Sequence, residues 1–507
     1  MPGDALALYD SLLKISRQSR LLSGISSALE WDQETYMPSG GAGIRAEQLE
    51  VMAGMAHKLK TSKSFTQALS KLIEIDSGKI LAKKLPAPHL AALREWRRDY
   101  FKAKALPNAF VKKFAKLTSQ AILVWRSAKK DDAFQRFAPY LEKIVELNRQ
   151  KAEYRGYGDH PYDALLDDYE PGISTKEVSQ LFSGLHKSTA ALLKKIVAAK
   201  QVDDSFLFGK FSLDKQLLMA NKLLEAMGFD FTKGRLDIST HPFSSASHPT
   251  DSRVTTRIHA DSLMSNLSAA LHEGGHSLYE MGLPAEQYGS PLCEPISLAF
   301  HESQSRWWET RIGQSQAFCR YLLPHIQQLF GGKLKQISVA DLYRAVNKVE
   351  PSFIRVEADE VTYNLHVILR FEMEKALIEG SLAIRDVPEA WNAKMQKYLG
   401  ITPRSNSEGC LQDIHWSMGA FGYFPTYTLG NLYASQLFSA FAQQFPAWEE
   451  NVAQGDFSFI KQWLNANVHA HGRCFSSREL LLQISQKPFS EKYFTDYIQK
   501  KYADIYA

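Results

Sequence analysis

The sequence predicts a mainly α-helical protein with one small β ribbon, and three features of the chain support this prediction. Long segments repeat apolar residues at the three- and four-residue spacing of amphipathic helices. Clusters of proline and glycine interrupt these segments, without long polar linkers between them. One stretch, residues 234–258, has instead the alternating, β-branched composition that is typical of strands.

Helical periodicity extends along most of the chain. It is clearest in residues 5–23, 108–126, 131–152, 177–199, 214–227, 361–378 and 429–444. Breaks are expected at 85–89 (LPAPH), 169–175 (YEPGIST) and 423–431 (YFPTYTLGN). None of these breaks is long or polar enough to separate independent domains, so we expect residues 1–507 to form a single unit.

The ribbon is expected within residues 234–258, where two β-favouring runs, LDIST and RVTTRI, flank a turn rich in serine and proline. This pattern predicts a hairpin directly before the helix that contains residues 271–280. An edge strand in this position could hold an extended peptide by main-chain pairing.

Composition and charge exclude several classes of protein. The chain is 45% hydrophobic and 23% charged, as in soluble globular proteins, and its net charge of +5 is mixed along the sequence. The sequence has no basic stripe that would predict a nucleic-acid partner. The four cysteines are far apart and form no C-x-x-C pair, which indicates a reducing compartment. Without a signal-peptide pattern or an apolar run of about 18 residues, we expect a cytoplasmic protein that does not contact membranes.

The segment LHEGGHSLYE, residues 271–280, contains the pattern His-Glu-x-x-His. On a helix, His272 and His276 lie on one face, where two imidazole nitrogens can bind one metal ion. Glu273 would lie beside the ion and could accept a proton from a water molecule bound to it. Gly274 and Gly275 fill the variable positions, although glycine costs a helix about 1 kcal/mol relative to alanine. We interpret them as positions where a neighbouring helix or a binding groove comes close.

A catalytic zinc ion usually has three protein ligands, so another element must supply the third. The extended metzincin motif would place a histidine at 282, where this chain has Gly282. Glu280 lies too far along the same helix, and Glu294 precedes a proline in an expected loop. Glu302, on the next periodic helix, is the predicted third ligand. Its neighbour His301 faces about 100° away on the same helix. His301 has three alternative interpretations: a residue that supports the ligands, a substrate contact or a packed core histidine.

Further segments occur together with these two motifs. In chain order the whole set is LEWDQETYMP (29–38), YDALLDDYEPG (162–172), HPF (241–243), DSRVT (251–255), HEGGH (272–276), HESQSR (301–306), IRVEAD (354–359), GCLQDIHW (409–416) and WLNANVHAHGR (463–473). In this combination the chain resembles the thermostable carboxypeptidase (carboxypeptidase Taq) family of metallocarboxypeptidases.

The resemblance implies a mostly helical, saddle-shaped homodimer with a deep groove between two helical lobes. Each subunit would hold one zinc or cobalt ion through His272, His276 and Glu302. The implied activity is stepwise removal of single amino acids from peptides with a free C-terminal carboxylate, with broad side-chain tolerance except for a C-terminal proline. A water molecule on the ion would attack the scissile carbonyl, with Glu273 as general base.

Binding of a free carboxylate requires a cationic group, and a guanidinium group can bind both oxygens. Arg355 in IRVEAD resembles the family position that has this role. Arg253 in DSRVT is the alternative candidate, although it also suits a structural ion pair with Asp251 or Asp359 that would brace the ribbon.

The negative charge that develops on the substrate oxygen requires a hydrogen-bond donor. The candidates are His241, His415, Tyr423 and Tyr427. Asp413 and Gln412 are predicted to orient a ligand histidine, which normally donates its other N–H to a carboxylate or carbonyl.

Two other functions are alternatives. A zinc oligopeptidase or dipeptidyl carboxypeptidase on a similar helical fold would use the same metal chemistry, and the distance from the carboxylate-binding arginine to the metal separates it from a carboxypeptidase. A helical binding protein without catalysis is the alternative from another class, which the complete set of ligands and base disfavours.

Overall fold

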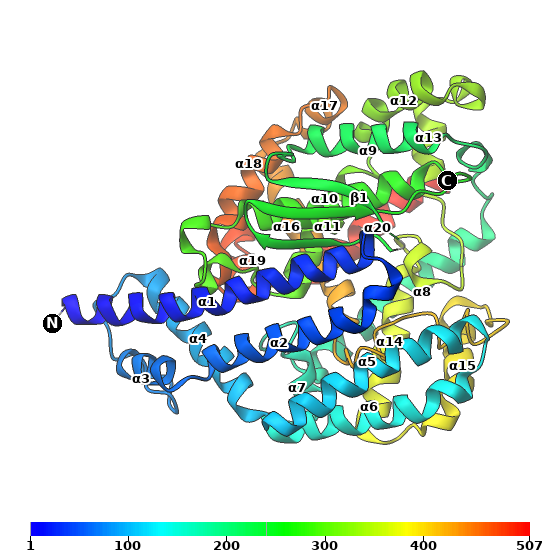
Figure 1. Ribbon diagram of the computed structural model, residues 1–507. Helices are drawn as coiled ribbons and strands as arrows, with labels where there is room; N and C mark the ends of the chain where they lie inside the picture. The colour runs from blue at the N-terminus through cyan, green and yellow to red at the C-terminus, as the bar shows by residue number, and fades with distance from the viewer. Residues whose placement is uncertain (1, 240) are drawn as a thin grey trace.

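The computed structural model describes residues 2–239 and 241–507, and its fold is helical with one small sheet, as predicted (Figure 1). Before the sheet come α1 (Pro2–Thr35), α2 (Ala42–Lys60), α3 (Lys63–Leu72), α4 (Ala87–Ala105), α5 (Asn108–Lys130), α6 (Phe134–Arg155), α7 (Asp163–Leu166), α8 (Thr175–Ala198) and α9 (Leu213–Met227). After it come α10 (Met264–Gly282), α11 (Leu298–Arg306), α12 (Gln316–Phe330), α13 (Val339–Val346), α14 (Tyr363–Glu379), α15 (Val387–Leu399), α16 (Pro425–Gln444), α17 (Trp448–Ala453), α18 (Ser458–Asn467), α19 (Ser477–Ser485) and α20 (Lys492–Ile505). None of the described helices is both long and apolar enough to cross a membrane.

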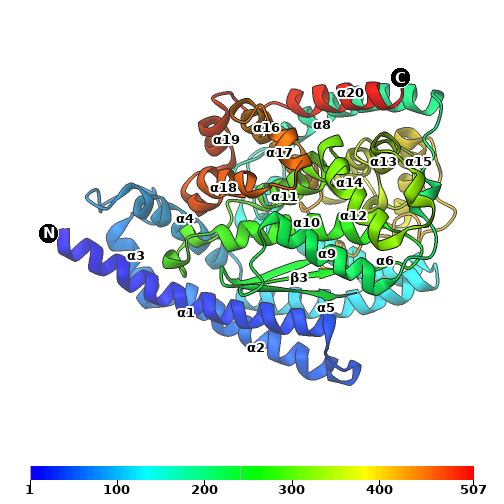
Figure 2. The same ribbon diagram turned by 90° about the horizontal axis from the view of Figure 1, so that it is seen from above.

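The sheet lies between α1 on one face and α10 on the other (Figure 2). The end of α1 is held on the sheet by Trp31, whose ring lies 5.0 Å from the Arg235 guanidinium carbon and 4.5 Å from that of Arg253. A large hydrophobic core surrounds α10, α11, α14 and α16, and a smaller one joins α1, α3 and α4 through residues such as Tyr9, Leu69 and Trp96. The metal motif therefore lies on a helix that the sheet and the large core cover from two sides.

Each segment with clear helical periodicity forms a helix, and local signals explain several of their ends. The Ser174 hydroxyl and the Glu177 carboxylate form a capping box at the start of α8. Gly228, with φ of 87°, ends α9 in the left-handed conformation. The break expected at 423–431 is wrong, because α16 begins at Pro425. Proline is tolerated in the first helical turn, where its missing N–H would have no partner in the helix.

The sheet has three strands, β1 (Gly234–Ile238), β2 (Ser244–His248) and β3 (Asp251–Thr256), in the order β1-β3-β2. The predicted ribbon is therefore correct in place but wrong in detail. The two predicted runs pair in parallel, as β1 and β3, and the serine-rich segment expected as a turn is strand β2, antiparallel to β3. A parallel pair cannot be closed by a tight turn, so the chain between them must cross over, and here it forms the third strand.

Candidate active site

Both glycines of the metal motif lie where α10 meets another helix. A Cβ atom on Gly275 would lie 2.7 Å from the carbonyl oxygen of Gln304 and 2.8 Å from the Cα atom of Ser305, both on α11. A Cβ atom on Gly274 would lie 2.6 Å from Leu224 Cδ2 on α9. The close approach predicted from the sequence is thus present, and at Gly275 it is an approach between two backbones.

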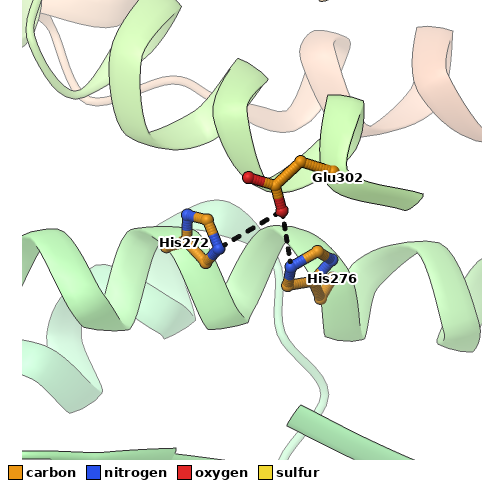
Figure 3. Close-up of side chains that lie close together, drawn as sticks. All are labelled: His272, His276 and Glu302. Carbon is orange, nitrogen blue, oxygen red and sulfur yellow. Dashed lines mark ion pairs between the residues drawn. The ribbon is translucent and has the colours of Figure 1, made fainter. Parts of the chain in front are cut away.

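This approach brings Glu302 on α11 to the two histidines of α10. Its Oε2 atom lies 3.6 Å from His272 Nε2 and 3.4 Å from His276 Nε2 (Figure 3). Two ligands bound at 2.0 to 2.1 Å in a tetrahedron are about 3.3 Å apart, so these separations suit atoms that share one ion. Among the described residues, Glu302 Oε1 and His276 Nδ1 are buried without a hydrogen-bond partner. The three side chains therefore fit a divalent cation.

The electrostatics of the cluster also favour a cation. Burial raises the pKa of Glu302, but the two histidines and Arg306 outweigh it and lower this pKa to about 2, so the side chain is a carboxylate. Burial lowers the pKa of His276 to about 3, which keeps its imidazole neutral. At His272, burial is outweighed by Glu302 and Glu309, which raise the pKa to about 9. Two carboxylates therefore stabilise positive charge at this point.

Glu273 lies next to His272 on α10, and only 8% of its surface is exposed. Burial raises its pKa to about 7, with a further contribution from the Glu302 charge, while His272 and the Ser244 hydroxyl of β2 oppose the shift. A carboxyl group with a pKa near neutrality can both accept and return a proton.

His272 has a carboxylate partner that the sequence reasoning missed. Its Nδ1 atom lies 2.8 Å from Glu309 Oε2, in the π-helical turn Trp307–Ile312 (η5) that continues α11. Glu309 is seven residues after Glu302, and two helical turns place such residues on one face. This spacing in the sequence is the signal that could have identified Glu309 as a residue of the site.

His301 contacts a predicted ligand directly. Its ring stacks on that of His276, with centroids 4.5 Å apart and an angle of 21° between the planes. Its Nε2 atom is 3.0 Å from Glu280 Oε1. Glu294, which precedes Pro295 in a loop, forms an ion pair with Arg473 at 3.1 Å and is not among the three converging ligands.

Arg355 is almost fully buried, and most of its donors are used. Nε and Nη2 donate to Asp413 Oδ1 at 3.1 and 2.9 Å, and Nη1 donates to the Tyr363 hydroxyl at 3.0 Å. A guanidinium group has five N–H donors, so these bonds to described residues leave two. Arg253 has a different setting, because it forms an ion pair with Asp251 at 2.9 Å and lies over Trp31.

The prediction that Asp413 and Gln412 orient a ligand histidine is wrong. Asp413 accepts hydrogen bonds from Arg355 and, at 2.7 Å, from Arg370 Nε. Gln412 Oε1 accepts from the backbone N–H of Arg355, and its amide nitrogen donates to the carbonyls of Phe353 and Glu408. In the described chain neither residue hydrogen-bonds a histidine, because both are occupied in holding Arg355 and its loop.

Three of the predicted oxyanion donors lie together. The Tyr427 hydroxyl is 3.1 Å from His415 Nε2, and the Tyr427 ring lies 4.6 Å from the Arg355 guanidinium carbon. Tyr423 lies 5.3 Å from Tyr427, ring to ring. Burial, with the charge of Glu302 as a further cause, raises the pKa of both tyrosines, so their hydroxyls stay protonated. No described contact joins His241 to this group, since its side chain is exposed in the loop between β1 and β2.

Comparison with known proteins agrees with this arrangement. A family model described as carboxypeptidase Taq (M32) metallopeptidase matches residues 11–502. The chain is 39% identical to thermostable carboxypeptidase 1 of Thermus thermophilus over 99% of both chains, and 37% identical to carboxypeptidase 1 of Bacillus subtilis over 98% of both.

Solved structures show the same fold. An M32 carboxypeptidase from Deinococcus radiodurans is 34% identical, covers 99% of each chain and has a TM-score of 0.94. A metallocarboxypeptidase 1 from Trypanosoma cruzi is 31% identical, covers 98% of this chain and 99% of its own, and has a TM-score of 0.91. The chain therefore belongs to the carboxypeptidase Taq (M32) family of metallopeptidases and is a metallocarboxypeptidase, an enzyme that hydrolyses peptide bonds.

Proposed function

We propose that this enzyme removes single C-terminal amino acids from peptides, with broad side-chain tolerance. One zinc or cobalt ion per subunit would be held by His272, His276 and Glu302. The observation that carries the proposal is the convergence of three ligand atoms within 4.8 Å of one another, with the buried carboxyl group of Glu273 beside them.

A divalent ion held by these side chains would lower the pKa of a water molecule and polarise the scissile carbonyl. Glu273 acts as the general base, taking a proton from the attacking water and passing it to the leaving amine. Its position beside His272 on a rigid helix supports this role, and so does its burial, which keeps bulk water from competing for the proton.

Arg355 binds the C-terminal carboxylate of the substrate. Asp413 occupies one edge of the guanidinium group and thereby fixes its plane, while two N–H donors are left for two carboxylate oxygens. Arg253 is the weaker candidate, because its Nε and Nη2 atoms both donate to Asp251. Tyr427 lies against Arg355 and near Glu302, and its neutral hydroxyl, or that of Tyr423, donates to the developing oxyanion.

The main chain of β2 holds the peptide backbone. β2 is an edge strand of the described sheet, since β3 pairs with it on one side. Its first residue, Ser244, lies beside Glu273, so a peptide that pairs with the free edge of β2 would pass the general base.

The assay that tests this function compares N-blocked dipeptides with longer, internally quenched peptides. A carboxypeptidase that removes single residues cleaves the blocked dipeptide and releases its C-terminal amino acid. Cleavage of the quenched peptides alone would assign the enzyme to the oligopeptidases or dipeptidyl carboxypeptidases instead. The proposal includes a homodimer, as the resemblance implies, and sedimentation equilibrium measures the mass of the assembly directly.

A further inference from the structure

A chain of polar side chains, most of them buried, leads away from His272 and is not used by the proposed reaction. His272 Nδ1 and Arg306 Nη1 both lie 2.8 Å from the same oxygen, Oε2 of Glu309. Arg306 Nε donates to Asn431 Oδ1 on α16 at 2.6 Å, and Asn431 Nδ2 donates to Asn364 Oδ1 on α14 at 3.0 Å. The carboxylate that faces His272 is thus tied to three different helices.

We propose that Glu309, held by Arg306, is a positioning residue that keeps His272 in the tautomer and orientation needed to bind the metal ion. This inference rests on the ligand set of the proposed function. An Nδ1–H that donates to Glu309 leaves the lone pair of His272 on Nε2, the atom that faces Glu302.

The two histidines differ in this respect. His276 Nδ1 is buried without a hydrogen-bond partner among the described residues, and its ring is instead held by stacking on His301. Among the described residues, the Glu309 carboxylate therefore orients His272 and not His276. A single substitution, at Glu309, is enough to free the His272 ring from this orientation.

The hydrogen bond from Arg306 fixes the oxygen that faces His272. Arg306 Nη1 donates to Glu309 Oε2 at 2.8 Å, and the same oxygen lies 2.8 Å from His272 Nδ1. Because Arg306 is itself held by Asn431 of α16, it sets the direction from which this oxygen meets the imidazole ring.

The test measures metal binding by the full-length protein rather than activity alone. Zinc affinity is measured by competition with a chromophoric chelator, and the cobalt-substituted protein is examined by visible absorption. Glu309→Gln keeps the shape of the side chain but removes its charge, and we expect its zinc Kd to rise about 10- to 100-fold. Glu294→Gln is the matched control, because its carboxylate pairs with Arg473 and not with a predicted ligand or a residue that contacts one, and its Kd should stay within about threefold of the wild-type value.

A Glu309→Gln protein that binds zinc as tightly as the wild type, with an unchanged cobalt spectrum, would overturn the inference. The double variant Glu309→Gln/Arg306→Met should bind zinc about as weakly as Glu309→Gln alone, since both residues act through one oxygen. A double variant that binds zinc clearly more weakly than Glu309→Gln would refute the role of Arg306. Circular dichroism of the metal-free variants checks that each one folds. A different result would contradict the proposed metal site rather than the role of Glu309. In that case His272→Ala would bind zinc like the wild type.

Discussion

Arg355 donates two hydrogen bonds to a single oxygen of Asp413, from Nε at 3.1 Å and from Nη2 at 2.9 Å. Arg370 donates to the other oxygen of Asp413 at 2.7 Å. One carboxylate thus holds two buried arginines, and Arg355 lies 4.6 Å from the centre of the Tyr427 ring. These hydrogen bonds fix the orientation of Arg355, which in its proposed role lowers the cost of ordering it when a carboxylate binds.

Arg355→Lys should weaken recognition of the free C-terminus. A lysine keeps the positive charge but cannot bind two oxygens with a fixed fork, so kcat/KM for peptides with a free C-terminal carboxylate should fall about 10- to 100-fold. The measurement is the ratio of kcat/KM for a free-acid substrate to that for its amide. Arg253→Lys is the control, and a larger loss of this ratio in the control than in Arg355→Lys would transfer the role to Arg253.

Glu273→Gln should retain the metal and lose turnover. Glutamine fills the same space but cannot take a proton, and a general base contributes about 100- to 10,000-fold. Metal content by atomic absorption and kcat on an N-blocked dipeptide are measured on the same preparation. Wild-type kcat in this variant would exclude Glu273 as the base.

Removal of the metal should abolish activity reversibly. Treatment with phenanthroline is expected to inactivate the enzyme, and zinc or cobalt should restore it, because both ions suit two imidazoles and a carboxylate. The thermal midpoint should also rise when metal is added back, since the ion binds the folded chain. Activity that survives exhaustive chelation would contradict the predicted mechanism.

The two glycines of the motif should differ in their tolerance of alanine. At Gly275 the new methyl group would meet the backbone of Gln304 and Ser305, which cannot rotate away, so we expect a loss of about 1 to 3 kcal/mol and weaker metal binding. At Gly274 it would meet the flexible Leu224 side chain, and the gain in helix propensity offsets part of the cost. Urea unfolding of both variants measures the difference, and equal stabilities would show that the backbone contact does not limit the position.

Stability in acid should depend on Asp168, which lies in the YDALLDDYEPG segment. Burial raises its pKa, but Lys151 at 2.7 Å, Arg155 and Lys102 outweigh it and lower the pKa from 3.8 to about 2. The carboxylate therefore stabilises the fold by on the order of 2 kcal/mol above pH 4, and this contribution is lost as the pH falls from about 4 to 2.

In Asp168→Asn, the unfolding free energy should be lower at pH 7 and should depend less on pH between 4 and 2. Asp131→Asn serves as the control, because Asp131 pairs with Arg136 at an exposed site where both side chains are 48% accessible. Parallel pH profiles of wild type and Asp168→Asn, measured by urea titration, would show that the ion pairs of Asp168 do not stabilise the fold.

Local patterns predicted the helices well, because each long helix carries its own apolar stripe and often its own cap. Local patterns do not determine contacts between distant segments. Gly430 belongs to the break expected at 423–431, but it lies inside α16, where a Cβ atom would lie 2.5 Å from Glu302 Cγ. The strand order β1-β3-β2 likewise depends on which segments pair, and alternation within a strand carries no such information.

At the site, helical spacing and the second periodic helix pointed to residues that do converge, namely His272, His276 and Glu302. The residues that surround them were harder to assign. Asp413 follows Gln412 in a histidine-containing motif, and this neighbourhood in sequence suggested a partner for a histidine, whereas its partners are arginines from two other segments. Which charged side chains pair in this way depends on the segments that the fold brings together, and not on their neighbours in the sequence.

The helix that carries Glu302 touches glycine on both sides, Gly275 of α10 and Gly430 of α16. At Gly275 no side chain separates α10 from α11, so their backbones meet directly and the distance between them cannot be tuned by exchanging one side chain for a slightly larger one. Selection among divalent ions must then depend on other factors, namely the residues that orient the ligands and the ions that the cell supplies. A variant with altered metal preference is therefore to be sought at Glu309 or Arg306 rather than along the contact between the helices.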